Sequence, residues 1–188
     1  MRKIISKKEE AKKQQKNQVI LGLILVGVMF LSVLGYAFSG SSGENKKTKY
    51  NEFEFFEKDG LWYSKVQNSY FIFRYNPYEV DDIESEIKPI SFYYNEPLYL
   101  FSESNEASYE ISNNFEKIVE RIQPACIDEG ECSGDFPVKT CENNFIIIKE
   151  NNSTDIIQNE SCVFIYGSYK DLTKITDEFL FKVLGIKE

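Results

Sequence analysis

The feature that most constrains this chain is an apolar segment, Val19 to Phe38, which contains no Asp, Glu, Lys or Arg. In a helix that rises about 1.5 Å per residue, a segment of this length spans roughly 30 Å, the thickness of the hydrocarbon core of a bilayer. The sequence therefore predicts a transmembrane helix over residues 19–38. This helix would separate a short tail, residues 1–18, from the rest of the 188-residue chain.

Charge is distributed unevenly on the two sides of this segment. Residues 1–18 carry seven basic and two acidic side chains, a net charge of +5, whereas the whole chain has −8, which leaves −13 for the remainder. Because basic flanks stay in the cytoplasm, we predict a cytoplasmic tail, which can also contact anionic lipid headgroups, and an extracytoplasmic domain. So acidic a domain repels phosphate backbones, and we expect no nucleic-acid partner.

Other fates of the apolar segment are less consistent with the sequence. A cleaved signal peptide has a shorter apolar region, of roughly 7–15 residues, although Gly35-Tyr36-Ala37 resembles a cleavage site and leaves cleavage open. No Cys stands directly after the segment, where lipoprotein anchoring requires one, and Asn17-Gln18-Val19 lacks the residues typical of a pilin precursor. We favour an uncleaved signal anchor in the cell membrane.

The residues after the anchor predict a flexible linker, 39–49, and one globular domain, 50–188. The domain begins with aromatic-rich runs separated by the turn signals Asp59-Gly60, Gln67-Asn68 and Asn76-Pro77, which predict three antiparallel strands. We expect the aromatic side chains to pack between this sheet and helices. An exposed aromatic stripe that binds carbohydrate or a partner is the alternative.

Further periodic patterns predict the rest of the domain. Residues 79–95 are expected to form a turn of helix or an irregular connection, with a strand near 90–94. Short apolar runs predict strands at 98–101, 145–148, 156–157 and 162–166. Apolar stripes predict two helices: Ala107, Ile111, Phe115, Ile118 and Ile122 in the first, which Pro124 ends, and Leu172, Ile175, Phe179 and Val183 in the second. Asp171 is the expected N-cap of the second helix and Gly185 its end.

Together these elements predict an α+β or α/β fold. It would comprise the N-terminal transmembrane helix, an aromatic-rich antiparallel meander, and a mixed sheet packed by two amphipathic helices. The strand–helix–strand unit should cross over with a right hand and produce at least one parallel strand pair.

Four cysteines, Cys126, Cys132, Cys141 and Cys162, all follow the anchor. Their spacing lacks the two close pairs of a structural zinc site, and an even number in an extracytoplasmic domain indicates two disulfides. Of the three possible connectivities we favour Cys126–Cys132 with Cys141–Cys162. A redox-active pair is the alternative, but the acidic neighbours of Cys126 would raise a thiol pKa rather than lower it.

Asn151, Asn152 and Asn159 each begin an Asn-x-Ser/Thr triplet and are possible glycosylation sites on one predicted loop.

No pattern in the sequence identifies catalytic, cofactor-binding or metal-binding residues. The absence of His excludes Ser-His-Asp and Cys-His nucleophilic systems and His-ligated metals. The acidic residues between 128 and 135 lack EF-hand spacing, the adjacent Asp81 and Asp82 are poorly placed to act on one substrate bond, and no Gly-rich phosphate loop is present. Gly167-Ser168 is typical of an ordinary strand-to-helix turn, although a helix N-terminus can hold an anion.

A set of features resembles a group of uncharacterised archaeal membrane-anchored proteins with a disulfide-bearing extracytoplasmic domain. The features are Trp62, Tyr75-Asn76-Pro77, Cys126 to Cys141 with Cys132 and Pro137 between them, Cys162-Val163-Phe164-Ile165, and the ending from Phe179 to Ile186. The resemblance covers most of residues 50–188 and implies an envelope-exposed, disulfide-linked domain. It implies no activity.

The sequence therefore favours a single-pass membrane protein whose domain binds a partner or belongs to an envelope assembly. Its expected partners are the lipid bilayer, through residues 19–38, and a protein of the membrane or envelope. Two other hypotheses stay open: a hydrolase that uses carboxylates alone, and a subunit of a secretion or pilus-type assembly. The hydrolase hypothesis requires two carboxyl groups that face each other across a cleft.

Overall fold

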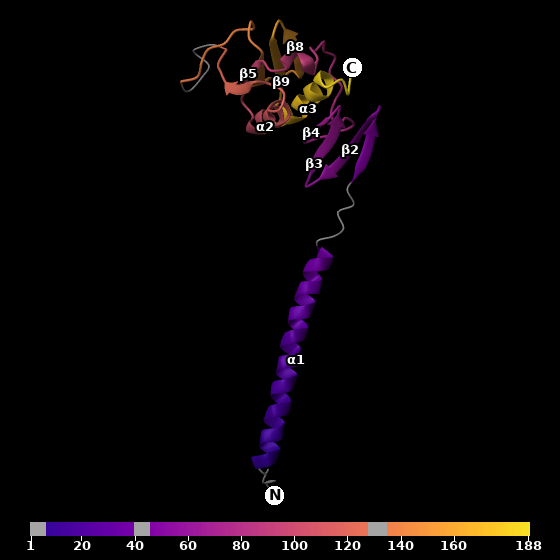
Figure 1. Cartoon of the computed structure of the whole chain (residues 1–188). Helices are drawn as coiled ribbons and strands as arrows, with labels where there is room; N and C mark the ends of the chain where they lie inside the picture. The colour runs from indigo at the N-terminus through magenta and orange to yellow at the C-terminus, as the bar shows by residue number, and fades with distance from the viewer. Residues whose placement is uncertain (1–6, 40–45, 128–134) are drawn as a thin grey trace. The chain divides into compact units, whose positions relative to one another are not determined.

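A computed structural model describes residues 7–39, 46–127 and 135–188 of the chain (Figure 1). These residues belong to two compact units, 1–44 and 45–188. The first unit is a single helix, and the second contains two β-sheets and two helices.

The helix of the first unit, α1 (Lys7–Ser39), contains the apolar segment predicted to be helical. Its most apolar part, Gln15–Val33, has 19 residues with a mean hydropathy of 1.8, and none of it is buried within the structure. By length and composition this helix is able to cross a membrane. The helix also extends beyond residues 19–38 at both ends and includes much of the basic tail.

Sheet A is an antiparallel meander of four strands: β1 (Lys47–Tyr50), β2 (Phe53–Lys58), β3 (Leu61–Val66) and β4 (Ser69–Phe73). The turn between β2 and β3 has positive φ at both Asp59 and Gly60, as the Asp-Gly signal predicts for a two-residue hairpin. The sequence predicts only three of these strands. Strand β1 begins inside the range predicted to be a linker, 39–49, so the globular unit starts earlier than expected.

Sheet B is mixed, with strand order β6-β5-β7-β9-β8. Its strands are β5 (Pro97–Ser102), β6 (Arg121–Pro124), β7 (Phe145–Glu150), β8 (Asp155–Asn159) and β9 (Cys162–Gly167). Neighbouring strands are parallel except for the antiparallel hairpin of β8 and β9. The predicted mixed sheet is therefore present, and β7, with its first four residues buried, lies at its centre.

Two helices, α2 (Asn105–Phe115) and α3 (Leu172–Val183), pack between the sheets. One continuous core joins side chains from sheet A, both helices and one face of sheet B, including Phe55, Phe73, Ile111, Phe179 and Ile146. Figure 1 shows the helices between the strands of the two sheets. The opposite face of sheet B has a smaller core around Tyr99, Phe145 and Ile147, which the segment after β6 helps to cover.

The ends of the helices differ partly from the sequence predictions. Ser104 caps α2 and accepts a hydrogen bond from Ala107 N–H at 3.3 Å. Helix α2 ends at Phe115, and the chain through Ile118 leads into strand β6 rather than extending the helix to Pro124. Because Ile118 and Ile122 contact the same core from these non-helical positions, they continue the apolar pattern without continuing the helix.

Helix α3 has the predicted extent. Asp171 occupies the N-cap position but its side chain makes no capping bond, and it accepts a hydrogen bond from Ser168 Oγ instead. At the other end, Gly185 has φ +70°, and the bonds Gly185 N–H to Lys182 O and Ile186 N–H to Phe181 O form a Schellman motif. The predicted stop at Gly185 is confirmed. A strand predicted near 90–94 is wrong, because Ile90–Tyr93 form a 3₁₀ turn, η1.

Candidate functional site

A groove of about 1090 Å³ lies beside α2 on the described part of the domain. It begins at the carboxyl end of β5, where parallel sheets commonly bind ligands, and continues between α2 and the edge strand β6. Its apolar lining comes from Leu100, Phe101, Ile122, Pro124, Ala125 and Phe136. A concave surface with an apolar base and a polar rim is the usual form of a ligand site.

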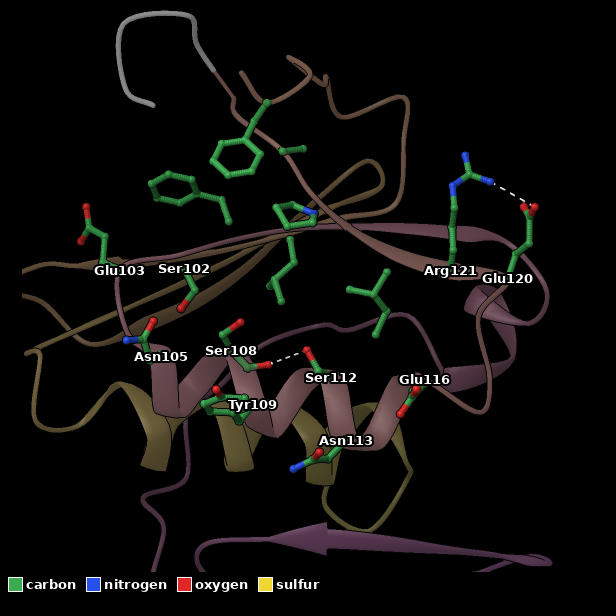
Figure 2. A pocket seen from close by; sticks show the side chains of 16 residues that line it. Ser102, Glu103, Asn105, Ser108, Tyr109, Ser112, Asn113, Glu116, Glu120 and Arg121 are labelled. Carbon is green, nitrogen blue, oxygen red and sulfur yellow. Dashed lines mark hydrogen bonds and ion pairs between the residues drawn. The ribbon is translucent and has the colours of Figure 1, made fainter. Parts of the chain in front are cut away.

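One side of α2 supplies the polar wall of this groove. The side chains recur at helical spacing and are almost all uncharged: Asn105, Ser108, Tyr109, Ser112, Asn113 and Glu116. Figure 2 shows them along the helix, with Glu120 and Arg121 across the groove. The helix therefore has two different stripes, an apolar one that enters the core and a polar one that faces the groove.

Several polar groups of the groove have no partner among the described residues. Ser112 Oγ donates to Ser108 O at 2.9 Å, and Ser102 Oγ donates to Ser104 O at 2.7 Å, so these two hydroxyls are used locally. The side chains of Asn105, Ser108 and Asn113 make no such bond in the described structure. Amide and hydroxyl groups of this kind both donate and accept hydrogen bonds, so they are suited to a polar ligand.

Charged groups at the rim of the groove are partly neutralised. Arg121 Nη1 forms an ion pair with Glu120 Oε1 at 3.0 Å. Glu103 Oε2 accepts a hydrogen bond from the backbone N–H of Glu150 at 2.6 Å. Glu116 is exposed at the end of α2. The groove therefore offers neutral hydrogen-bonding groups more than a strong field.

A pair of carboxyl groups lies in the core, away from this groove. Glu110 of α2 and Asp177 of α3 interact with each other, and Asp177 Oδ2 also accepts the N–H of Tyr75 at 2.8 Å. Burial raises the pKa of Glu110 to about 7, and Arg74 opposes this rise. Burial, together with the negative charge of Glu110, also raises the pKa of Asp177.

The unpaired oxygens of these two side chains indicate how the pair is stabilised. Glu110 Oε2 and Asp177 Oδ1 are buried and have no hydrogen-bond donor. A single proton held between them would satisfy both oxygens, because a carboxylic acid donates and a carboxylate accepts. The two carboxyl groups do not face each other across a cleft, as the hydrolase hypothesis requires, because they interact directly inside the core and do not line the groove.

The adjacent acids predicted to be poor catalysts, Asp81 and Asp82, make ion pairs with the last part of the chain. Asp81 Oδ2 lies 2.9 Å from Lys174 Nζ. Asp82 Oδ1 lies 3.7 Å from Lys182 Nζ and 4.0 Å from Lys187 Nζ. Lys187 also contacts the buried Glu178 at 2.6 Å. These contacts attach the irregular segment after sheet A to α3 and the C-terminus.

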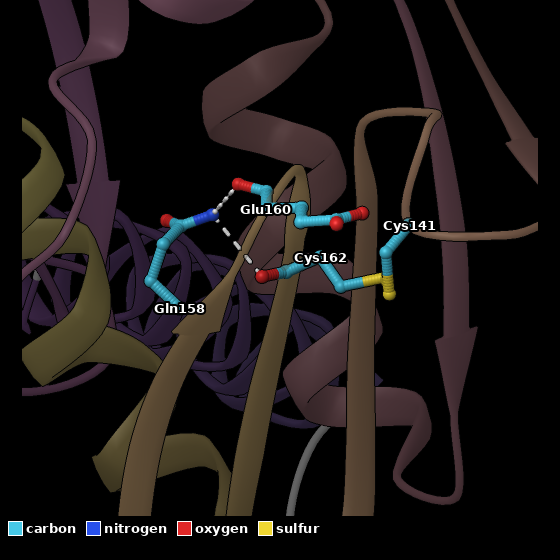
Figure 3. The surroundings of a disulfide bond; sticks show 4 residues. All are labelled: Cys141, Gln158, Glu160 and Cys162. Atoms are coloured by element: carbon cyan, nitrogen blue, oxygen red, sulfur yellow. Dashed lines mark hydrogen bonds between the residues drawn. A yellow bond between two sulfur atoms is a disulfide. The ribbon is translucent and has the colours of Figure 1, made fainter.

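The Cys141–Cys162 disulfide is present, as predicted for this pair, with its Cα atoms 4.8 Å apart. Figure 3 shows it at the start of β9, beside the turn where Gln158 Nε2 donates to the carbonyl oxygens of Glu160 and Cys162. Cys126 has no free thiol, but its predicted partner Cys132 lies outside the described residues. The disulfide is typical of an oxidising compartment.

Other predicted sites are dispersed. Asn151 and Asn152 are exposed in the loop after β7, whereas Asn159 is exposed at the far end of β8, so the three triplets do not share one loop. Most of the acidic segment 128–135 lies outside the described residues, and no group of His, Cys, Asp or Glu suited to a metal occurs in the described part of the chain. Gly167 packs closely on the last helix, because a Cβ there would lie 2.1 Å from Ile175 Cδ1 and the Ile175 side chain would have to shift.

The sequence alone predicted neither the groove nor the buried carboxyl pair. The groove had a detectable signal, since Asn105, Ser108, Ser112 and Asn113 form a polar stripe beside the apolar stripe used to predict the helix. Glu110 falls next to the apolar stripe, and Asp177 lies within a helix that is buried almost all round. Only the tertiary structure brings them together.

Comparison with family models, with curated proteins and with solved structures found no match to this chain. Among the features that resemble the archaeal membrane-anchored group, the structure shows the disulfide of Cys162 with Cys141. Archaeal origin and membership of that group stay predictions.

Proposed function

We propose that this protein is a single-pass membrane protein whose extracytoplasmic domain binds a polar ligand or partner in the groove beside α2. The observation that carries the proposal is the polar stripe of α2, in which Asn105, Ser108 and Asn113 offer unused hydrogen-bonding groups above an apolar base. Stable folding alone does not require such groups to line a concave surface.

The remaining support comes from the N-terminal helix and from the disulfide of the domain. A helix able to cross a membrane precedes the domain, with seven basic residues in the tail before the apolar segment. The domain contains a disulfide, which is characteristic of proteins outside the cytoplasm. A membrane-anchored binding or envelope-assembly module accounts for all three features.

Site-specific photo-crosslinking in intact membranes tests the proposed groove. Tyr109 lines the groove and is 68% exposed, whereas Tyr169 is 56% exposed and does not line it. Each is replaced in turn by p-benzoylphenylalanine, and the membranes are irradiated. We expect a discrete adduct from position 109, and we expect no such adduct from position 169.

A second substitution makes this test specific for the groove. Ser112→Arg places a large side chain in the middle of the polar wall, and should abolish the adduct at position 109 without lowering the melting temperature by more than a few degrees. Equal adducts from both tyrosine positions, or an adduct unaffected by Ser112→Arg, would contradict a binding site in this groove. Saturable turnover of an envelope substrate by the purified protein would contradict a purely binding role.

A further inference from the structure

The face of sheet A that points away from the core has an unusual composition. Strand alternation and register place ten side chains on it: Lys47, Lys49, Glu54, Phe56, Lys58, Leu61, Tyr63, Lys65, Tyr70 and Ile72. Four are lysines, one is acidic, and the other five are aromatic or aliphatic. We refer to this set as the lysine-aromatic face.

The aromatic residues of the lysine-aromatic face pack on one another rather than into the core. Phe56 and Tyr63 are opposite each other in register and stack with ring centroids 5.4 Å apart, and Tyr70 meets Phe56 edge-on at 6.3 Å. None of the three belongs to either core cluster, and Tyr70 is 56% exposed. The face also has a hollow of about 440 Å³ beside Lys47, Lys49 and Phe56.

The charge of this face is opposite to that of the rest of the domain. Residues 45–188 carry 15 basic and 27 acidic side chains, a net charge of −12, whereas the lysine-aromatic face carries +3. The rest of the domain is therefore at −15. None of the four lysines forms an ion pair in the described part of the structure.

We propose that the lysine-aromatic face docks on the anionic surface of the bilayer that α1 crosses. Lysine ammonium groups are attracted to anionic headgroups, and aromatic side chains prefer the membrane–water interface. The proposal rests on the proposed membrane anchoring, and it adds a second contact between the chain and the membrane.

Chain connectivity and charge favour a bilayer over other occupants. Only residues 40–46 separate the end of α1 from Lys47, a span of at most roughly 25 Å when fully extended. A second copy of the face would bring together two sets of four lysines, which repel each other. A long polyanion such as a nucleic acid would meet the strongly acidic remainder of the domain.

Depth-dependent quenching in nanodiscs tests the proposal on the full chain. Tyr63→Trp places a fluorophore on the face, and Tyr169→Trp places one on an exposed turn outside it; the buried Trp62 is a constant background. Nanodiscs contain phosphatidylcholine with a headgroup-proximal doxyl lipid, either alone or with about one-third phosphatidylglycerol. We expect the Tyr63→Trp chain to be quenched at least threefold more strongly in the anionic nanodiscs, and the Tyr169→Trp chain to be quenched equally in both.

Charge-reversal variants show whether the lysines cause the effect. In the Tyr63→Trp background, Lys47→Glu with Lys65→Glu should remove the additional quenching, whereas Lys117→Glu, an exposed lysine outside the face, should retain it within about 20%. Half-molar NaCl should weaken the quenching. Quenching that is equal in neutral and anionic nanodiscs, or unchanged by the double variant, would overturn the proposal.

Two controls separate this proposal from its alternatives. Co-elution of the chain with nanodiscs reports the insertion of α1. If the chain inserts but its fluorescence is not quenched, only the proposed docking of the lysine-aromatic face is contradicted. If the chain does not insert, the proposed membrane anchor is contradicted. Heparin or a single-stranded oligonucleotide is added to the lipid-free protein in detergent. If either polyanion bound through the same lysines more tightly than the anionic nanodiscs, the proposal of a bilayer would be overturned in favour of a soluble acidic partner.

Discussion

At the scale of single residues, the contact with the largest expected effect on stability is the carboxyl pair Glu110 and Asp177. Both side chains are nearly inaccessible to solvent, and each has one buried oxygen without a donor. Deprotonation of the second carboxyl group would leave two negative charges in the core, and Arg74 is the cation of the described residues that acts on Glu110. Two such charges are unfavourable in a medium of low dielectric constant. The pair therefore makes the α2–α3 contact dependent on a proton.

This pair predicts that the domain becomes less stable as the pH rises from about 4.5 to about 7. Because the folded-state pKa of Glu110 is raised from 4.5 to about 7, the native state binds more protons than the unfolded state between these values. The stabilisation from this pKa shift is complete below about pH 4.5 and is lost as the pH rises through the folded-state pKa of Glu110. The free energy of unfolding should therefore decrease by roughly 3 kcal/mol by about pH 8. Urea unfolding at a series of pH values, followed by Trp62 fluorescence, measures it.

The variant Glu110→Gln identifies the group responsible. An amide at this position still donates a hydrogen bond to Asp177 but does not lose a proton, so the decrease between about pH 5 and 8 should become smaller by more than half. Glu84→Gln removes an exposed carboxylate that does not contribute to the pKa shift of either acid, and it should leave the wild-type pH dependence unchanged. A wild-type protein whose stability is constant, or rises, over this pH range would contradict the shared proton.

Asn114 joins α2 to sheet A through a role that the sequence does not distinguish from that of its neighbour Asn113. Its amide accepts the N–H of Ile72 at 2.8 Å and donates to Ile72 O at 2.6 Å, so α2 pairs with the outer edge of β4 much as another strand would. Asn113, the preceding residue, faces the groove. Two adjacent asparagines thus have unrelated roles, and only the packing of α2 between the sheets separates them.

At the scale of elements, the buried strands were predictable, whereas two of the four edge strands, β1 and β6, were not. Runs such as Phe145–Ile148 and Cys162–Tyr166 are apolar because both faces of a central parallel strand are covered. Strand β1 was missed because alternate positions are lysines on the lysine-aromatic face, which resemble a polar linker. Strand β6 was missed because its one apolar core residue, Ile122, lies at the position where the apolar stripe of the preceding helix would continue.

The disulfide predicts a measurable stabilisation of the β8–β9 end of sheet B. Cys141 and Cys162 are 21 residues apart, and closing a loop of this length lowers the entropy of the unfolded chain by an amount worth about 3 kcal/mol. The double variant Cys141→Ser with Cys162→Ala should lose about this much free energy of unfolding in oxidising buffer. The measurement is denaturant unfolding of both chains in parallel.

A reducing buffer provides the matched control for this variant. Once the wild-type disulfide is reduced, the two chains should differ by less than about 1 kcal/mol, because only the substituted atoms then distinguish them. If the difference were the same in both buffers, the variant would have acted through packing at the buried Cys162 and not through the cross-link.

At the scale of the whole molecule, features that are local in the sequence were easier to recognise than sites assembled from several elements. The uncharged segment, the basic tail and the cysteines lie in separate parts of the chain and can be recognised without tertiary contacts. The groove and the lysine-aromatic face each combine side chains from at least two elements, so their composition becomes visible only after strand register and helix packing are known. This explains why the sequence indicated no binding residue.

Both proposed surfaces depend on the same topology of the chain. If α1 crosses the membrane with its basic end in the cytoplasm, the disulfide-bearing domain faces an oxidising exterior, and the groove is accessible to partners there. If the orientation were reversed, the domain would face a reducing compartment, in which disulfides rarely persist. The orientation of α1 is therefore the central claim.

Protease accessibility in intact cells tests this claim most directly. With an epitope tag at each end of the chain, protease added outside intact cells should remove the C-terminal tag and cleave the chain after about residue 40, within the segment that joins α1 to β1. The N-terminal tag should stay on a fragment of about 5 kDa until the membrane is permeabilised. Loss of the N-terminal tag with survival of the domain in intact cells, or protection of the whole chain, would contradict the account.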